Sequence, residues 1–137
     1  MLAGHTSVLV HNCGLADIAA DHRANANGGL GVKTDKNIAV ARVQVDGSNN
    51  VMTATSGRHV NPGETGMPAI RRFDPGTRPF DSETHIFETL AGRLTPESKG
   101  VIDLYSERPV CTSCEGLINQ FKQQFPGIRV NISTGVG

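Results

Sequence analysis

Apolar positions along the chain change several times between helical and strand-like spacing. Residues spaced three or four apart predict helices over 15–26, 82–94 and 112–124. Short runs rich in β-branched residues predict strands over 38–45, 51–55, 101–105 and 128–132, and residues 1–12 are predicted to form an extended lead. This order predicts an α/β fold with a mixed sheet, in which crossover helices link the later strands.

Two polar segments separate these elements. A turn cluster that begins at Asp46 and Gly47 lies between the first two strands and predicts a β-hairpin. Residues 57–80 contain many Pro, Gly and Arg residues without any regular spacing, and they predict a long loop. Long loops in compact domains are often functional, so this segment is a candidate for substrate contacts.

The composition narrows the class of protein. The 137 residues, 37% of them hydrophobic, suffice for one domain with a modest core. The 13 Lys and Arg residues balance the 13 Asp and Glu residues, which argues against a strongly electrostatic non-specific nucleic-acid binder but allows a local basic patch. No apolar run approaches the roughly 20 residues that cross a bilayer, and no secretory signal is expected at the N-terminus.

Two of the three cysteines, Cys111 and Cys114, lie three positions apart just before a predicted helix. The positive end of the helix dipole favours thiolates there, so the pair could bind a metal or act in redox chemistry. The odd count, with Cys13 alone, favours such a site in a reducing compartment over a disulfide framework. A thioredoxin-like motif is disfavoured because the pair precedes the last helix. A structural zinc site is disfavoured because it would need a fourth ligand.

A second cluster, Asp-Ser-Glu at residues 81–83, opens the preceding predicted helix and on its own would be an ordinary helix cap. Together with a Cys-x-x-Cys pair, however, the cluster indicates a catalytic metal site. Zinc-dependent nucleobase deaminases use such a pair, a third ligand, and a Glu two residues after that ligand as acid and base. In this chain Glu83 would be the acid and base, and the zinc ligands would be Asp81, Cys111 and Cys114. His85, one helical turn after Asp81, is the rival third ligand.

From about residue 36 to its end, the chain resembles the deaminase toxins of bacterial polymorphic-toxin systems. The matching segments are residues 71–74, 81–83, 104–114, 118–121 and 125–128. The similarity is closest to the branch that acts on cytosine in single-stranded DNA. In that branch the Asp-x-Glu order is the usual form, which supports Asp81 over His85 as the third ligand.

The resemblance implies a cytidine-deaminase-like mixed sheet of five strands flanked by helices, with one zinc ion. It also implies deamination of cytosine to uracil in single-stranded DNA. Residues 8–13 resemble the junction before the toxin tip of large secreted toxins. We therefore expect a junction remnant over residues 1–14 and a single deaminase domain over residues 15–137.

The resemblance further implies secretion as part of a larger toxin, action in the cytoplasm of a target bacterium, and a cognate immunity protein. The domain is expected to act as a monomer without a membrane segment. RNA, double-stranded DNA or adenine as the target, and an inactive zinc-stabilised binding module, are the alternatives. Arginine and aromatic side chains suit single-stranded DNA, so the candidate substrate contacts are Arg71, Arg72, Phe73 and Ser106. Alternatively the loop is merely solvated and its Phe residues pin it to the core.

Overall fold

A computed structural model describes residues 3–26, 29, 31–33, 36–57, 60–68, 73, 81–108 and 112–135, without the side chains of residues 3–13 and 112–114. Its elements are, in order, α1 (Ala3–Asn25), β1 (Ile38–Val45), β2 (Ser48–Thr55), α2 (Ser82–Ala91), β3 (Gly100–Ser106), α3 (Thr112–Gln124) and β4 (Ile128–Thr134). Their order confirms the predicted succession of helix, hairpin, helix, strand, helix and strand.

The four strands form one mixed sheet in the order β2-β1-β3-β4. β1 is antiparallel to both of its neighbours, whereas β3 and β4 are parallel. β2 and β3 therefore run in the same direction on either side of β1, so the connections through α2 and α3 are both crossovers. This confirms the α/β class with a mixed sheet. The fifth strand that the family resemblance implied is not found among the residues that the structure describes.

The hairpin between β1 and β2 turns on two residues. Val45 pairs with Ser48, and Asp46 and Gly47 between them have φ angles of 52° and 81°. Two successive positive φ angles define the type I′ turn, for which Asp-Gly is a favoured pair. The hairpin is thus confirmed, but β2 begins three residues earlier than predicted, because residues 48–50 pair with β1 instead of joining the turn.

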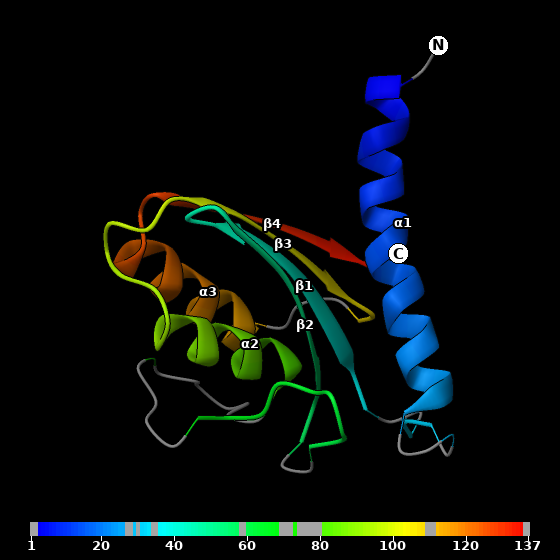
Figure 1. Ribbon diagram of the computed structural model, residues 1–137. Coiled ribbons are helices and arrows are strands. Elements are labelled where there is room, and N and C mark those ends of the chain that lie inside the picture. The colour runs from blue at the N-terminus through cyan, green and yellow to red at the C-terminus, as the bar shows by residue number, and fades with distance from the viewer. Residues whose placement is uncertain are drawn as a thin grey trace.

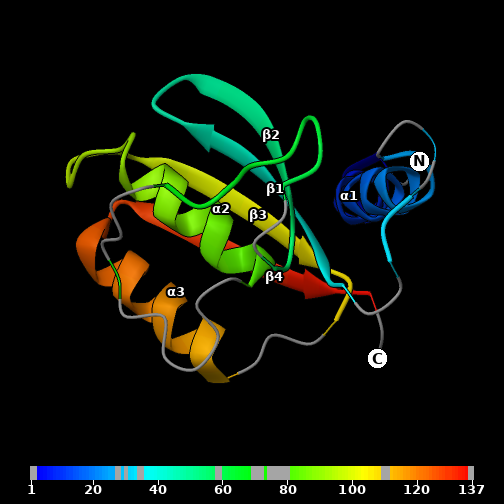
Figure 2. The same cartoon turned by 90° about the horizontal axis from the view of Figure 1, so that it is seen from below.

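Helices cover both faces of the sheet (Figures 1 and 2). α2 and α3 pack on one face over the larger hydrophobic core, where the rings of Phe87 and Phe121 lie 4.9 Å apart. α1 lies against the other face, where a smaller apolar cluster contains Leu15, Ala19, Ile38 and Val40. Alternate residues of β1 point into the two clusters, as the period of a strand requires.

The prediction of an extended lead over residues 1–12 is wrong, because α1 begins at Ala3. The prediction rested on the β-branched residues Val8 and Val10, whose preference for strands is weak. Extending an existing helix adds a hydrogen bond for each residue without a new nucleation cost, and residues 15–25 supply that helix. Within the described part of the chain, no helix has both the length and the apolar character needed to cross a membrane.

Candidate active site

α2 is a short helix that is buried on almost every side. Of its ten residues only Thr89 is not fully buried, and five of the buried ones are polar or charged. The sheet covers one side of the helix, and the segment 60–68 bonds to another through Thr65 and Gly66. Burying polar groups costs free energy unless they are hydrogen-bonded. The polar, buried start of α2 is therefore the candidate place for chemistry in this fold.

Both carboxylate oxygens of Glu83 accept a hydroxyl hydrogen bond. Ser82 donates its Oγ–H to Oε1 at 2.6 Å, and Ser106, at the end of β3, donates to Oε2 at 3.4 Å. Asn37 lies behind both serines, and its Nδ2 donates to each Oγ at 2.9 Å and more weakly to Oε1 of Glu83 at 3.3 Å. Because each serine oxygen accepts from the amide, each hydroxyl hydrogen is directed at the carboxylate.

A backbone amide fixes which way the Asn37 side chain faces. The N–H of Arg108 lies 3.1 Å from Oδ1 of Asn37, and a backbone N–H can only donate, so this atom is the oxygen. Asn37 is not among the site residues predicted from the sequence. Its only sequence signal is a polar residue directly before a strand, and the partners of its side chain lie 45 to 71 positions away.

Burial raises the pKa of Glu83 above its usual value, and the negative charge of Asp81 raises it further. The hydrogen bonds from Ser82 and Ser106 work in the opposite direction without cancelling the rise. Glu83 is 2% exposed. A buried carboxyl with a raised pKa can hold a proton closer to neutral pH and pass it on, which is the property that a general acid and base requires.

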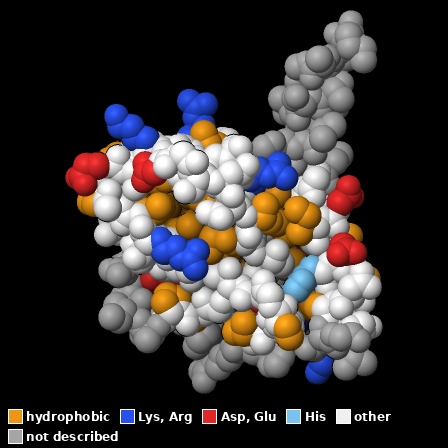
Figure 3. All heavy atoms as spheres, in the orientation of Figure 1, with side chains coloured by type: hydrophobic (Ala, Val, Ile, Leu, Met, Phe, Trp, Pro, Cys, Tyr) orange, Lys and Arg blue, Asp and Glu red, His pale blue; other side chains and the backbone are white. Residues whose placement is uncertain are grey.

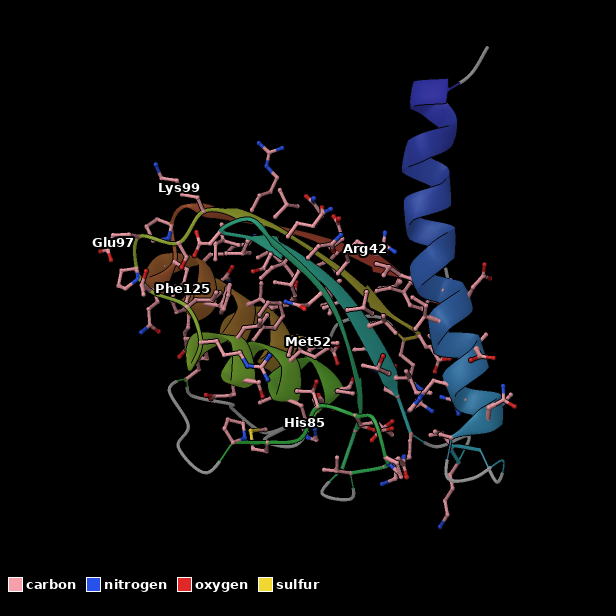
Figure 4. All side chains as sticks on the ribbon, in the orientation of Figure 1. Arg42, Met52, His85, Glu97, Lys99 and Phe125 are labelled. Atoms are coloured by element: carbon pink, nitrogen blue, oxygen red, sulfur yellow. The ribbon has the colours of Figure 1, made fainter. Side chains whose placement is uncertain are left out.

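Asp81 and His85 both lie at the start of α2 and are 7% and 2% exposed. Asp81 is the N-cap residue by position, but its side chain caps none of the N–H groups of α2, all of whose residues the structure describes. The Nδ1 of His85 lies 3.3 Å from the carbonyl oxygen of Thr65, so the ring points from α2 towards the segment 60–68 (Figure 4). A histidine that donates through Nδ1 keeps Nε2 for another partner.

The two cysteines of the predicted metal site lie mostly outside the described part of the structure. Cys111 is not described, whereas the backbone of Cys114 lies in the first turn of α3. α2 and α3 begin at the same end of the domain in both ribbon views (Figures 1 and 2). This confirms that both predicted clusters open helices, and it places the segments that hold Glu83 and Cys114 at one end of the same layer.

The donor set fits a zinc ion in its chemistry. Two thiolates and a carboxylate are ordinary zinc ligands. A cation there would also offset the repulsion through which Asp81 raises the pKa of Glu83. The described side chains alone bring no three His, Cys, Asp or Glu residues together as a metal site, and the side chains of Cys111 and Cys114 are not among them.

The predicted substrate contacts fall in different places. Arg71 and Arg72 lie outside the described residues. Phe73 is 7% exposed, packs edge-on against Phe121 with the ring centroids 6.1 Å apart, and donates its backbone N–H to the buried Glu88 carboxylate at 3.0 Å. This position favours the alternative in which Phe73 anchors the loop to the core. Ser106, fully buried, bonds to Glu83.

A family model for toxin deaminases, described as the BURPS668_1122 family of deaminases, matches residues 61–135. This match covers more than half of the 137 residues and contains α2, β3, α3 and β4. The chain belongs to the BURPS668_1122 family of toxin deaminases. It is therefore a deaminase toxin, and Glu83 and the Cys-x-x-Cys pair of this toxin deaminase both lie inside the matched segment. No protein with curated annotation matches the chain significantly.

Proposed function

We propose that this toxin deaminase converts cytosine to uracil in single-stranded DNA, with one zinc ion as cofactor and Glu83 as proton carrier. The observation that carries the proposal is the state of Glu83, which is 2% exposed and accepts a serine hydroxyl on each carboxylate oxygen. Such a network orients the carboxylate and leaves it no freedom to turn away from a substrate. Asp81, Cys111 and Cys114 would hold the zinc ion.

Hydrolytic deamination consumes one water and releases one ammonia. When bound, zinc supplies a Lewis acid that lowers the pKa of water. Glu83 takes a proton from the water that adds to C4 of the base, and it delivers a proton to the departing amino group. Burial raises the pKa of Glu83, with the charge of Asp81 as a further cause, and so brings both of its protonation states within reach.

We prefer Asp81 to His85 as the third ligand. Asp81 lies two residues before Glu83, which is the spacing that nucleobase deaminases use. Replacing Asp81 with Ala should therefore lower the zinc content of the purified protein, whereas replacing His85 with Gln should leave it near one ion per chain.

A single strand is the preferred substrate because the target base must leave its stack to reach a buried carboxylate. On the face drawn in Figure 3, the Lys and Arg side chains of the described residues are scattered, not gathered in one patch. The proposed contacts to phosphate are Arg71 and Arg72, which precede α2 in the sequence. We also propose that the domain is delivered by secretion into a target bacterium and is neutralised by a cognate immunity protein.

The test is uracil release by the purified, zinc-loaded protein from a single-stranded DNA oligonucleotide that contains cytosine. Glu83→Ala should abolish release while zinc stays bound. The matched control is Glu97→Ala, because Glu97 is exposed and lies at the far end of the α2–α3 layer (Figure 4). The control should retain the activity and the zinc content of the unmodified protein.

Three other results would change the assignment. Turnover of RNA alone or of adenine alone would change the assigned substrate but not the assigned catalytic residues. No turnover of any nucleic acid, together with a fully closed zinc coordination sphere, would favour a binding module without catalysis. Activity that survives in Glu83→Ala would remove Glu83 from the mechanism.

A further inference from the structure

The last turn of α1 reaches two segments that bond to side chains of α2, although α1 lies outside the family match at residues 61–135. Two consecutive residues, His22 and Arg23, make these contacts. Arg23 pairs with Glu107, directly after Ser106 in the chain, and His22 pairs with Glu64, directly before Thr65. Glu107 thus adjoins Ser106, whose side chain bonds to Glu83. Glu64 adjoins Thr65, whose carbonyl oxygen contacts His85.

The contact between Arg23 and Glu107 uses most of the guanidinium. Nη2 of Arg23 donates to Oε1 of Glu107 at 2.5 Å, and Nε donates to both carboxylate oxygens at 3.2 Å. The remaining donors reach the carbonyl oxygens of Lys33 at 2.8 Å and Lys36 at 2.6 Å. A planar fork that holds a carboxylate and two carbonyls at once fixes their relative positions, which a single point charge cannot do.

The segment held in this way is the one that leads from β3 to Cys111. Besides the Arg23 pair, the N–H of Glu107 donates to the carbonyl oxygen of Ile38 at 3.1 Å. The next amide, that of Arg108, donates to Oδ1 of Asn37 at 3.1 Å. Arg23 also bonds to Lys36, the residue before Asn37, so the same guanidinium restrains both partners of that hydrogen bond.

On the other side, Glu64 connects α1 to the segment that faces α2. Its side chain is 1% exposed and accepts from His22 and Thr55 at 2.5 Å and from Asn61 at 2.8 and 2.9 Å. The neighbouring Thr65 receives Nδ1 of His85 on its carbonyl oxygen. The segment 60–68, which bonds to α2, is thus tied to the same turn of α1 as the segment before Cys111.

We propose that the last turn of α1 is a positioning element of the active site, in which Arg23 holds the segment before Cys111 through Glu107 and His22 holds the segment 60–68 through Glu64. The proposal rests on the proposed function for its catalytic consequence. It predicts that the catalytic unit includes residues 22–37 in addition to the segment that the family model matches. Arg23 and His22 act through their partners and touch no reacting atom.

The packing of α1 can be separated from this polar contact. Leu15 and Ala19 of α1 are buried against Ile38 and Val40 of β1, one to two turns away from Arg23. A change at Arg23 therefore leaves the apolar anchor of α1 in place. If α1 served only to cover the sheet, removing the guanidinium would affect the whole domain evenly and would not act on one segment.

The test compares Arg23→Gln, Arg23→Lys and Glu107→Gln in the full zinc-loaded chain, with the exposed Arg93→Gln as matched control. Arg23→Gln and Glu107→Gln should each lower kcat between about tenfold and a hundredfold with little change in KM, because misplacement by an ångström costs about that much. Arg23→Lys, which keeps the charge but loses the fork, should recover part of kcat. The double variant, Arg23→Gln with Glu107→Gln, should lose no more kcat than either single variant, because both substitutions break the same contact.

Amide hydrogen exchange supplies a second readout that does not depend on turnover. The amides of Glu107 and Arg108 should exchange at least about tenfold faster in Arg23→Gln, whereas those in the middle of the β1–β2 hairpin stay unchanged. Unchanged kcat together with unchanged exchange, or an even acceleration across the domain, would overturn the proposal. If the unmodified protein has no deaminase activity, the proposed function fails, and the exchange at Glu107 and Arg108 still decides whether α1 positions this segment.

Discussion

Replacing Asn37 tests whether the Glu83 network depends on this amide. Asn37→Ala removes the donors to the Oγ atoms of Ser82 and Ser106, both at 2.9 Å, and the acceptor of the Arg108 N–H at 3.1 Å. Each buried hydrogen bond contributes about 0.5–1.5 kcal/mol net, so the free energy of unfolding should fall by about 2–4 kcal/mol. Turnover should fall as well, because Glu83 loses the groups that orient its hydroxyl donors.

Asn37→Asp provides a sharper comparison because it keeps the shape and the acceptor for Arg108. It replaces the amide nitrogen, 3.3 Å from Oε1 of Glu83, with a charged oxygen. Two full charges at that separation repel by about 5 kcal/mol at an effective dielectric constant of about 20, so the pair should take up a proton instead. Repulsion raises the pKa of both carboxyls in the folded state, and the stability of this variant should therefore fall as the pH rises.

The assay is chemical unfolding of the metal-free proteins between about pH 4 and about pH 8, the range in which shifted carboxyls titrate. Asn49→Asp, at an exposed position of β2, is the matched control and should show little dependence on pH. The reasoning is refuted if Asn37→Asp is as stable as the unmodified protein at the upper end of this range. A loss below about 0.5 kcal/mol in Asn37→Ala, the size of an ordinary surface change, would refute it equally.

Two further predictions concern the buried carboxylates of the metal-free protein. Burial and the charge of Asp81 raise the pKa of Glu83, so the stability it contributes is present below about pH 4.5 and is lost as the pH rises. Unfolding curves should therefore show Glu83→Gln to be more stable than the unmodified protein at neutral pH, by about 1.4 kcal/mol for each pKa unit of the shift. A less stable variant would contradict this. Burial acts to raise the pKa of Glu64, but hydrogen bonds from His22, Thr55 and Asn61 outweigh it and lower the pKa. Glu64→Gln should thus cost about 1–3 kcal/mol above pH 4.5, a difference that shrinks as the pH falls through the folded pKa; a constant difference would count against the network.

Much of the fold could be predicted because its signals are local. The strands β1, β3 and β4 and the helix α3 have the spacing of their element, and the Asp46-Gly47 pair predicted the hairpin. The N-terminal lead could not be predicted in the same way, because two β-branched residues outweighed the advantage of extending a helix that begins further along the chain.

In the candidate site, too, the residues with local signals could be predicted and those with distant partners could not. Glu83 stood out because residue types and short spacing carry the chemistry of an acid and base near a metal. Asn37, Arg23 and Glu64 did not stand out, because the contacts that tie them to the site join distant parts of the chain. His22 and Glu64 lie 42 positions apart, Asn37 and Ser82 lie 45 apart, and Arg23 and Glu107 lie 84 apart. Only the fold brings these residues together. Polar positions of this kind look like surface residues until the fold buries them.

We propose that two sulfurs and one carboxylate hold a single zinc ion beside Glu83, with one position left open. X-ray absorption at the zinc edge of the purified protein measures this directly. We expect two sulfur neighbours at about 2.3 Å and lighter neighbours at about 2.0–2.2 Å, with the light-atom shell altered in Asp81→Ala. A closed shell of four protein ligands would rule out the open position, and a spectrum that Asp81→Ala leaves unchanged would rule out Asp81 as a ligand.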